Sequence, residues 1–266
     1  MKTLDKESEL LDRYRSIPNH QIKYMGNFFS CLRVERLTRS IFFRKSWIDS
    51  SRKDELPPDY HNDKHHIMME MMRVDDCVGT LDGKHVPNAF EKENLMLKEK
   101  LGNNYKKVRD DIKVYFVPYT DDPTKYTYEG YINNFRDAVM KHSSKIEKYK
   151  NNYPKCKKTI FFISDESNEF CEVSNLEDKA KVENGGPGVK VRWHNPHIDN
   201  RFLDIIKEAK CDYIIWVQYY KNNKYKHRLV VPRILIIDVK GIKRNGIDYN
   251  AELMAKVKED HSYGTI

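Results

Sequence analysis

The sequence has few cysteines and no pairing pattern among them. Its five cysteines lie far apart and form no C-x-x-C pair: Cys31, Cys77, Cys156, Cys171 and Cys211. A disulfide framework and a cysteine-rich zinc site are therefore not expected. The pair His194-Asn-Pro-His197 is interrupted by Pro196, and no further cysteine or histidine follows at ligand spacing. We expect an ordinary polar loop there.

Long apolar runs and nucleotide-binding signatures are also missing. No stretch approaches the about 18 uncharged apolar residues of a membrane span. The first fifteen residues alternate acids and bases without a signal-peptide core, so we expect a cytoplasmic protein with no membrane contact. The motifs of P-loop NTPases, dinucleotide folds, α/β-hydrolases and zincins are absent, and Pro187 interrupts the one glycine-rich segment. No nucleotide cofactor is expected.

What is present is charge together with aromatic rings. The 266 residues include 48 Lys and Arg against 40 Asp and Glu, a net charge of +8, and 12% are aromatic. The aromatic content is typical of a folded core rather than of a disordered chain. The positive charge is concentrated in two segments: 141–158 has seven lysines and one acid, a net charge of +6, and 219–244 has eight bases and one acid, a net charge of +7.

These two basic segments predict a polyanion as partner. Lysines and arginines bind phosphates, and interleaved rings such as Tyr149, Tyr153 and Tyr219 can stack on exposed bases. Because lysine dominates over arginine, the composition favours non-specific contact. The residues that we expect to bind nucleic acid are Lys155, Lys157, Lys158, Lys221, Lys224, Lys226, Arg228, Arg233, Lys243 and Arg244. The alternative is a solvated lysine-rich surface without a partner.

Hydrophobic periodicity predicts α/β architecture, with a mixed sheet flanked by helices. We expect helices at residues 4–15, 63–74, 89–101, 128–149 and 198–210, with a helical tendency over 22–47. We expect strands at residues 112–119, 159–164, 170–174, 189–193, 213–219 and 229–239, the last interrupted by Pro232. The predicted organisation is a mainly helical region, 1–105, packed on an α/β core, 106–266, which together can form one continuous domain.

The most suggestive chemical pattern is Asp212 followed by Asp238-Val-Lys240. Over residues 201–242 the sequence resembles the PD-(D/E)XK nuclease superfamily, whose pattern is an aspartate on one strand and acid-x-Lys on the next. The resemblance implies that Asp212 and Asp238 bind Mg²⁺ and that Lys240 helps to activate the attacking water. Acid-x-Lys also occurs at residues 82, 111, 177 and 208, and Cys211 stands where the family pattern has proline.

The proposed site depends on the register of one hairpin. If residue numbers in opposed pairs sum to 450, Asp212 faces Asp238, and Lys240 lies on the same face as Asp238. A turn at Asn222-Asn223 instead gives a sum of 445 and places Arg233 opposite Asp212, which removes the site. The alternative to a metal site is that Asp212 caps a strand while Asp238 and Lys240 form a surface pair.

Three further acids are alternative metal ligands. Asp165 and Glu166 follow a buried strand, at the kind of strand end where α/β ligand sites form. Glu70 lies in the methionine-rich segment that we expect to be a helix.

The sequence favours two classes of function and allows a third. The first is a Mg²⁺-dependent nuclease-like protein that acts on DNA or RNA. The second is a non-catalytic nucleic-acid-binding or accessory protein of a defence or mobile element. The third is an α/β protein-interaction or small-ligand domain whose positive charge is incidental.

Overall fold

A computed structural model describes residues 4–51, 55–76, 126–186, 188–218, 224–225, 228–229 and 232–257. The chain divides into two compact units, residues 1–74, 132–165 and 194–249 in one, and residues 75–131, 166–193 and 250–266 in the other. The expected helix at 89–101 and the expected strand at 112–119 lie outside the described residues. None of the described helices is both long and apolar enough to cross a membrane.

A seven-stranded mixed sheet forms the centre of unit 1, which confirms the predicted α/β class. Its strands, in spatial order, are β1 (Ile22–Met25), β11 (Ile234–Asp238), β8 (Tyr213–Gln218), β5 (Lys158–Asp165), β4 (Ile67–Val74), β3 (Tyr60–Asn62) and β2 (Ile48–Asp49). The pairs β1–β11, β8–β5 and β5–β4 are parallel, and β11–β8, β4–β3 and β3–β2 are antiparallel.

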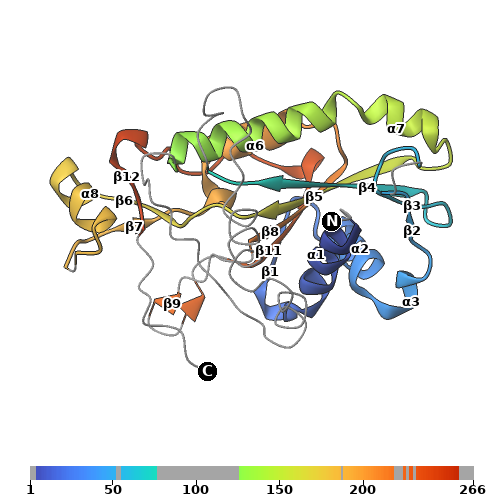
Figure 1. Cartoon of the computed structure of the whole chain (residues 1–266), viewed down its shortest axis with the longest axis horizontal. Helices are drawn as coiled ribbons and strands as arrows, with labels where there is room; N and C mark the ends of the chain where they lie inside the picture. Colours follow the sequence, from blue (N-terminus) through green and yellow to red (C-terminus); the bar gives the residue numbers. More distant parts are fainter. Residues whose placement is uncertain are drawn as a thin grey trace, which may run out of the picture. The chain divides into compact units, whose positions relative to one another are not determined.

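Helices cover both faces of this sheet, α1 and α2 on one side and α6 and α7 on the other (Figure 1). These helices are α1 (Leu4–Ser16), α2 (Phe28–Arg39), α6 (Tyr128–Ser143) and α7 (Ile146–Asn152). On the first face, Tyr14 of α1 and Val34 of α2 pack in one core with Phe162 and Ile215. On the second face, the ring of Phe135 lies 4.5 Å from that of Trp216. Alternate residues of the buried strands therefore serve two separate cores.

The methionine-rich segment is a strand, so the prediction of a helix at 63–74 was wrong. Residues 67–74 form β4, which is hydrogen-bonded to β5 along its whole length and is buried at six of eight positions. A strand that is covered on both faces needs apolar residues on both, and the resulting continuous run mimics a helical pattern. Asp63 consequently lies in the tight β3–β4 turn instead of capping a helix.

The N-terminal region supplies strands as well as helices. It contributes β1 to β4 to the central sheet itself, together with α1, α2 and the short α3 (Ile41–Arg44). The helix predicted at 4–15 is confirmed as α1, whereas the helical tendency over 22–47 holds only for α2 and α3.

The bounds of other helices and strands also differ from the predicted ones. The helix predicted at 128–149 is split into α6 and α7, and the helix predicted at 198–210 is confirmed as α9 (Asn200–Glu208). The strand predicted at 229–239 starts only at Ile234, two residues after Pro232, and lies between β1 and β8 in the sheet. The remaining hairpin, β9 (Lys224–Tyr225) with β10 (Arg228–Leu229), is antiparallel.

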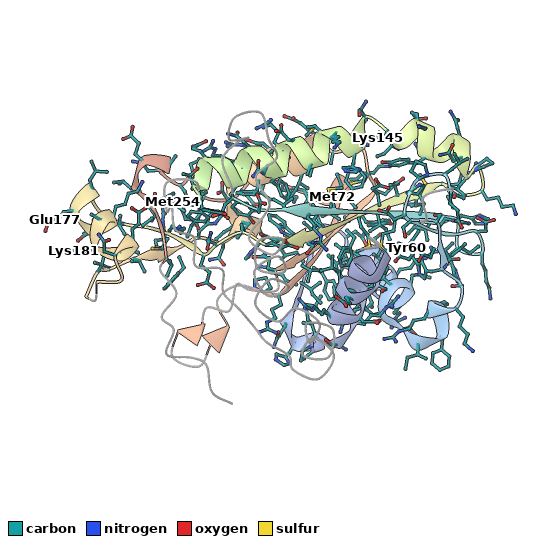
Figure 2. The ribbon with its side chains drawn as sticks, in the orientation of Figure 1. Tyr60, Met72, Lys145, Glu177, Lys181 and Met254 are labelled. Atoms are coloured by element: carbon teal, nitrogen blue, oxygen red, sulfur yellow. The ribbon has the colours of Figure 1, made fainter. Side chains whose placement is uncertain are left out.

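Unit 2 contains a three-stranded antiparallel sheet. Its order is β12 (Met254–Lys256), β6 (Phe170–Glu172) and β7 (Arg192–Trp193), and buried Cys171, Val173 and Ala255 form its core. The helix α8 (Leu176–Glu183) belongs to the same unit and begins after Asn175, whose side chain accepts the Asp178 N–H at 2.8 Å. On its exposed side, Glu177 and Lys181 form an ion pair of 2.8 Å (Figure 2).

Candidate nucleic-acid interface

The register between β8 and β11 separates the two aspartates of the predicted metal pair. Asp238 lies opposite Tyr213, so opposed residue numbers sum to 451, and both registers considered from the sequence were wrong. Since opposed residues share a face, Asp238 lies on the α2-covered face with Ile236. The site therefore lacks the pair of facing carboxylates that a shared cation needs.

Asp212 instead turns toward β5. Its Oδ2 accepts the backbone N–H of Thr159 at 3.0 Å, while its own N–H donates to the Thr159 carbonyl at 3.0 Å. Its Oδ1 lies 3.9 Å from the ammonium groups of both Lys158 and Lys240. Asp212 thus joins the beginnings of β5 and β8, and Lys240 pairs with it rather than with Asp238.

Strand directions place one end of every strand of the sheet along the same edge. β2, β4, β5 and β8 begin at this edge, and β1, β3 and β11 end at it. Exposed lysines occur in the segments that flank these strand ends. We call this set the basic edge: Lys64, Lys155, Lys157, Lys158, Lys210 and Lys240. Together with Asp63, Asp212 and Asp238 at the same edge, it carries six positive and three negative charges, a net charge of +3.

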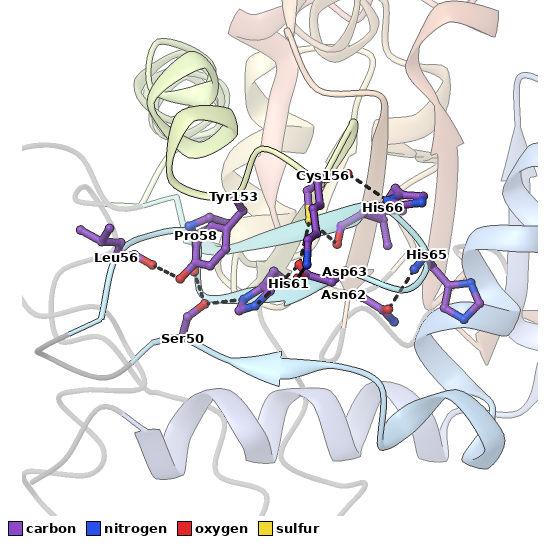
Figure 3. Close-up of polar contacts among 12 residues, drawn as sticks. Ser50, Leu56, Pro58, His61, Asn62, Asp63, His65, His66, Tyr153 and Cys156 are labelled. Carbon is purple, nitrogen blue, oxygen red and sulfur yellow. Dashed lines mark hydrogen bonds and ion pairs between the residues drawn. The ribbon is translucent and has the colours of Figure 1, made fainter.

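The segment that carries Lys155, Lys157 and Lys158 leads into β5 and packs against the β3–β4 turn, where Figure 3 shows Cys156 beside Asp63. The carbonyl of His66 accepts the backbone N–H groups of Lys157 at 2.9 Å and Lys158 at 3.2 Å, and the His66 ring bonds the Lys155 carbonyl at 3.0 Å. The ring of Tyr153 stacks on His61, with centroids 4.1 Å apart. These contacts fix the backbone of the lysine segment. Its three lysines are exposed, and the ammonium group of Lys155 lies 3.3 Å from Asp63 while that of Lys157 donates to the Pro154 carbonyl at 2.9 Å.

The same close-up places Cys156 near His61 and Asp63, but this cluster lacks an activated nucleophile (Figure 3). The Cys156 thiol is 1% exposed, and burial raises its pKa, so the thiol form is favoured over the thiolate. Burial likewise lowers the pKa of His61. Among the described residues no group of three or more His, Cys, Asp or Glu side chains is arranged to bind a metal ion.

Glu70 lies inside unit 1, away from the basic edge. It is 6% exposed in the middle of β4, and its Oε1 accepts the hydroxyl of Tyr149 at 2.8 Å. Nδ1 of His142 lies 2.8 Å from the same oxygen. Burial, followed by the Glu70 charge, raises the pKa of Tyr149, so the phenol stays protonated and donates to the carboxylate. This buried cluster links β4 to α6 and α7, and its role is structural.

Asp165 and Glu166 lie at the opposite end of β5 from the basic edge. Asp165 is 1% exposed and accepts the indole N–H of Trp216 at 3.0 Å. Glu166 is the first residue of the adjoining segment of unit 2. Neither carboxylate joins Asp212, so the alternative ligands do not complete a site with it.

The predicted nucleic-acid-binding residues are only partly brought together. Lys155, Lys157 and Lys158 lie on the basic edge. Arg233 precedes β11 and is therefore at the far end of the sheet, and the exposed Arg244 pairs with Asp204 at 3.0 Å and Asp248 at 3.4 Å. Lys243 is exposed three residues beyond Lys240. Lys221 and Lys226 lie outside the described residues, and only backbone is described for Lys224 and Arg228.

Two further expectations changed with burial. Tyr149 is fully buried, so it is not available to stack on a base. The histidines of the expected polar loop are also buried: Nε2 of His194 lies 2.8 Å from Asp199, and Nε2 of His197 accepts from Lys23 at 2.9 Å. This burial was not predicted, although Trp193 precedes His194 and Ile198 follows His197, and these apolar neighbours were the available signal.

A small cavity gives the small-ligand alternative little support. It has a volume of about 230 Å³ and a mixed lining, in which the charged Asp12, Arg15, Arg44 and Asp49 stand beside the apolar or aromatic Leu11, Trp47, Tyr60 and Met69. Ligand pockets commonly have about 300–1,000 Å³ and a mainly apolar lining.

The comparison with known proteins gives no relative. No protein-family model matches the chain, and no curated protein and no solved structure is significantly similar to it.

Proposed function

We propose that this protein binds nucleic acid through the basic edge of its central sheet, without acting as a metal-dependent nuclease at Asp212 and Asp238. The observation that carries the proposal is the convergence of Lys158 and Lys240, 82 residues apart in the sequence, on one oxygen of Asp212 at an exposed edge. Lysine segments that meet in this way form a continuous positive track, and such a track attracts a phosphate backbone.

Two features favour a binding role over hydrolysis. The carboxylate of Asp212 is already engaged by a backbone N–H and two ammonium groups. Asp238 has its side chain on the α2-covered face. Hydrolysis assisted by Mg²⁺ needs open oxygen ligands around one position.

The test is a binding titration with a labelled oligonucleotide of about 20 nucleotides, long enough to exceed the site size of one small domain. The variant Lys158→Gln/Lys240→Gln is compared with Lys181→Gln/Lys190→Gln, which removes the same charge from exposed positions in unit 2. We expect the first variant to lose about tenfold in affinity near 0.1 M salt and to reduce the salt slope by about 2, because two phosphate contacts disappear.

The control variant is expected to bind like the unmodified protein. Equal losses in both variants, or binding that does not respond to salt, contradict the proposal. The same mixtures are incubated with Mg²⁺. Cleavage that is abolished in Asp238→Ala supports the nuclease hypothesis instead.

A further inference from the structure

Exposed phenylalanines lie at both ends of the basic edge. Phe29 of α2 is 79% exposed and Phe42 of α3 is 90% exposed. Burying a phenylalanine ring on folding stabilises a protein, and two rings left in water contribute nothing of this kind to the fold. Single exposed apolar residues are common, but these two are positioned by the same row of strand ends as the lysines.

Phe29 lies at the end of the basic edge that carries Lys240. The turn between β1 and α2 packs directly against the segment after β11: a Cβ placed on Gly241 lies 2.7 Å from the Cα of Gly26 and 3.0 Å from the Asn27 nitrogen. Only glycine at 241 permits this approach. Phe28 and Phe29 follow at once, with their rings 5.6 Å apart and edge to face. The first exposed rings of α2 therefore neighbour Lys240.

Phe42 lies at the other end of the basic edge, near Lys64. The next ring, that of Phe43, lies 5.1 Å from the ring of His65 in the β3–β4 turn, which also carries Lys64. Ser46 accepts the side-chain amide of Asn62, the last residue of β3, at 2.8 Å. Exposed Arg44 and Lys45 continue the positive charge beyond the turn. Both ends of the basic edge thus combine cations with an exposed phenylalanine ring.

We infer that the nucleic acid of the basic edge is single-stranded, and that Phe29 and Phe42 are stacking platforms for bases at the two ends of its path. The inference rests on the proposed function. A duplex hides the faces of its bases, whereas an unpaired strand offers them to aromatic rings. Phosphates then contact the lysines between the rings.

The dimensions fit a short strand. Six steps separate β1 from β2 in the sheet, and at about 4.8 Å a step this gives roughly 29 Å. At the rise of about 3.4 Å per nucleotide that a strand has when its bases are stacked as in B-form DNA, such a path corresponds to roughly eight or nine nucleotides. An oligonucleotide of about four nucleotides reaches only one of the two rings.

The experiment measures fluorescence anisotropy of single-stranded oligonucleotides of about 12 and about 4 nucleotides, and of a duplex of the longer sequence. Phe29→Ala and Phe42→Ala are each expected to weaken binding of the longer strand by about five-fold or more, with an unchanged salt slope and unchanged duplex affinity. In both variants, the ratio of the affinity for the longer strand to the affinity for the shorter strand is expected to fall. Leu176→Ala, at a 67% exposed position on α8, is the matched control and is expected to change nothing.

The outcomes separate this inference from the proposed function. The inference is overturned, and the proposed function stands, if Lys158→Gln/Lys240→Gln loses affinity while both phenylalanine variants keep it. The same holds if the duplex and the single strand bind with equal affinity. If the unmodified protein shows no salt-sensitive binding to either, the proposed function fails. If the phenylalanine variants instead lose cosedimentation with phosphatidylserine vesicles, the surface docks on a membrane and the inference is overturned.

Discussion

Asp212 and Asp238 flank neighbouring strands at the same edge of the sheet, and their side chains project in different directions. Asp212 bonds the Thr159 N–H on β5, while Asp238 lies opposite Tyr213 on the α2-covered face. Asp212 therefore acts within the positive track, where it balances part of the charge of Lys158 and Lys240.

Removing the charge of Asp212 is expected to strengthen binding of nucleic acid. In Asp212→Asn the amide oxygen can still accept the Thr159 N–H, but Lys158 and Lys240 lose their nearest negative charge. We expect affinity for an oligonucleotide to rise about two- to five-fold at low salt, with a smaller gain at high salt because screening weakens the change. The measurement is the same anisotropy titration. A loss of affinity, or the loss of a Mg²⁺-dependent cleavage, contradicts this role.

The buried hydroxyl of Tyr149 is expected to be more important for stability than that of Tyr153. Tyr149→Phe leaves the Glu70 carboxylate, 6% exposed, with one donor fewer, which costs about 1–3 kcal/mol of unfolding free energy. Tyr153→Phe removes an exposed bond to the Leu56 carbonyl and costs about 1 kcal/mol or less. Urea unfolding of both variants measures the difference. Equal midpoints argue against a stabilising role of the Glu70 cluster.

His197 is expected to make the fold sensitive to acid. Burial, then the neighbouring Lys23 and His194 charges, lower the pKa of His197 to about 4 from its usual 6.5. The folded protein therefore favours the neutral ring, so its stability is complete above about pH 6.5 and declines as pH falls toward 4, by up to about 3 kcal/mol. Unfolding midpoints measured across this range test the effect.

The variant His197→Gln is the control for this pH dependence. Glutamine can still accept from Lys23 but does not titrate, so the decline between pH 6.5 and 4 is expected to become smaller. An unchanged decline assigns the acid sensitivity to other groups.

Gly241→Ala is expected to disturb the contact that places α2 beside Lys240. The added methyl group meets backbone atoms of Gly26 and Asn27 within 3.0 Å, and backbone cannot move aside as a flexible side chain does. We expect a loss of about 1–3 kcal/mol in unfolding free energy. The exposed neighbour Lys243→Ala is expected to stay within about 0.5 kcal/mol. Thermal unfolding of both variants checks this, and equal midpoints contradict it.

Much of the fold was predictable because its signals are local. The amphipathic period of α9, with buried Phe202, Leu203 and Ile206, and the apolar run of β5 identify their elements without tertiary information. The methionine-rich β4 was not predictable in this way. Its burial on two faces arises only when β5, α2 and α6 surround it, and a single sequence contains no record of such neighbours.

The sequence by itself determined the α/β class, the two lysine-rich segments and the absence of common catalytic motifs, since these follow from composition and short-range pattern. Only the tertiary structure decided which charges meet. Side chains alternate with a period of two along a strand, so a register sum of 451 instead of 450 moves Asp238 away from Asp212. The same tertiary structure brings Lys158 and Lys240 together at Asp212 and leaves Phe29 and Phe42 exposed.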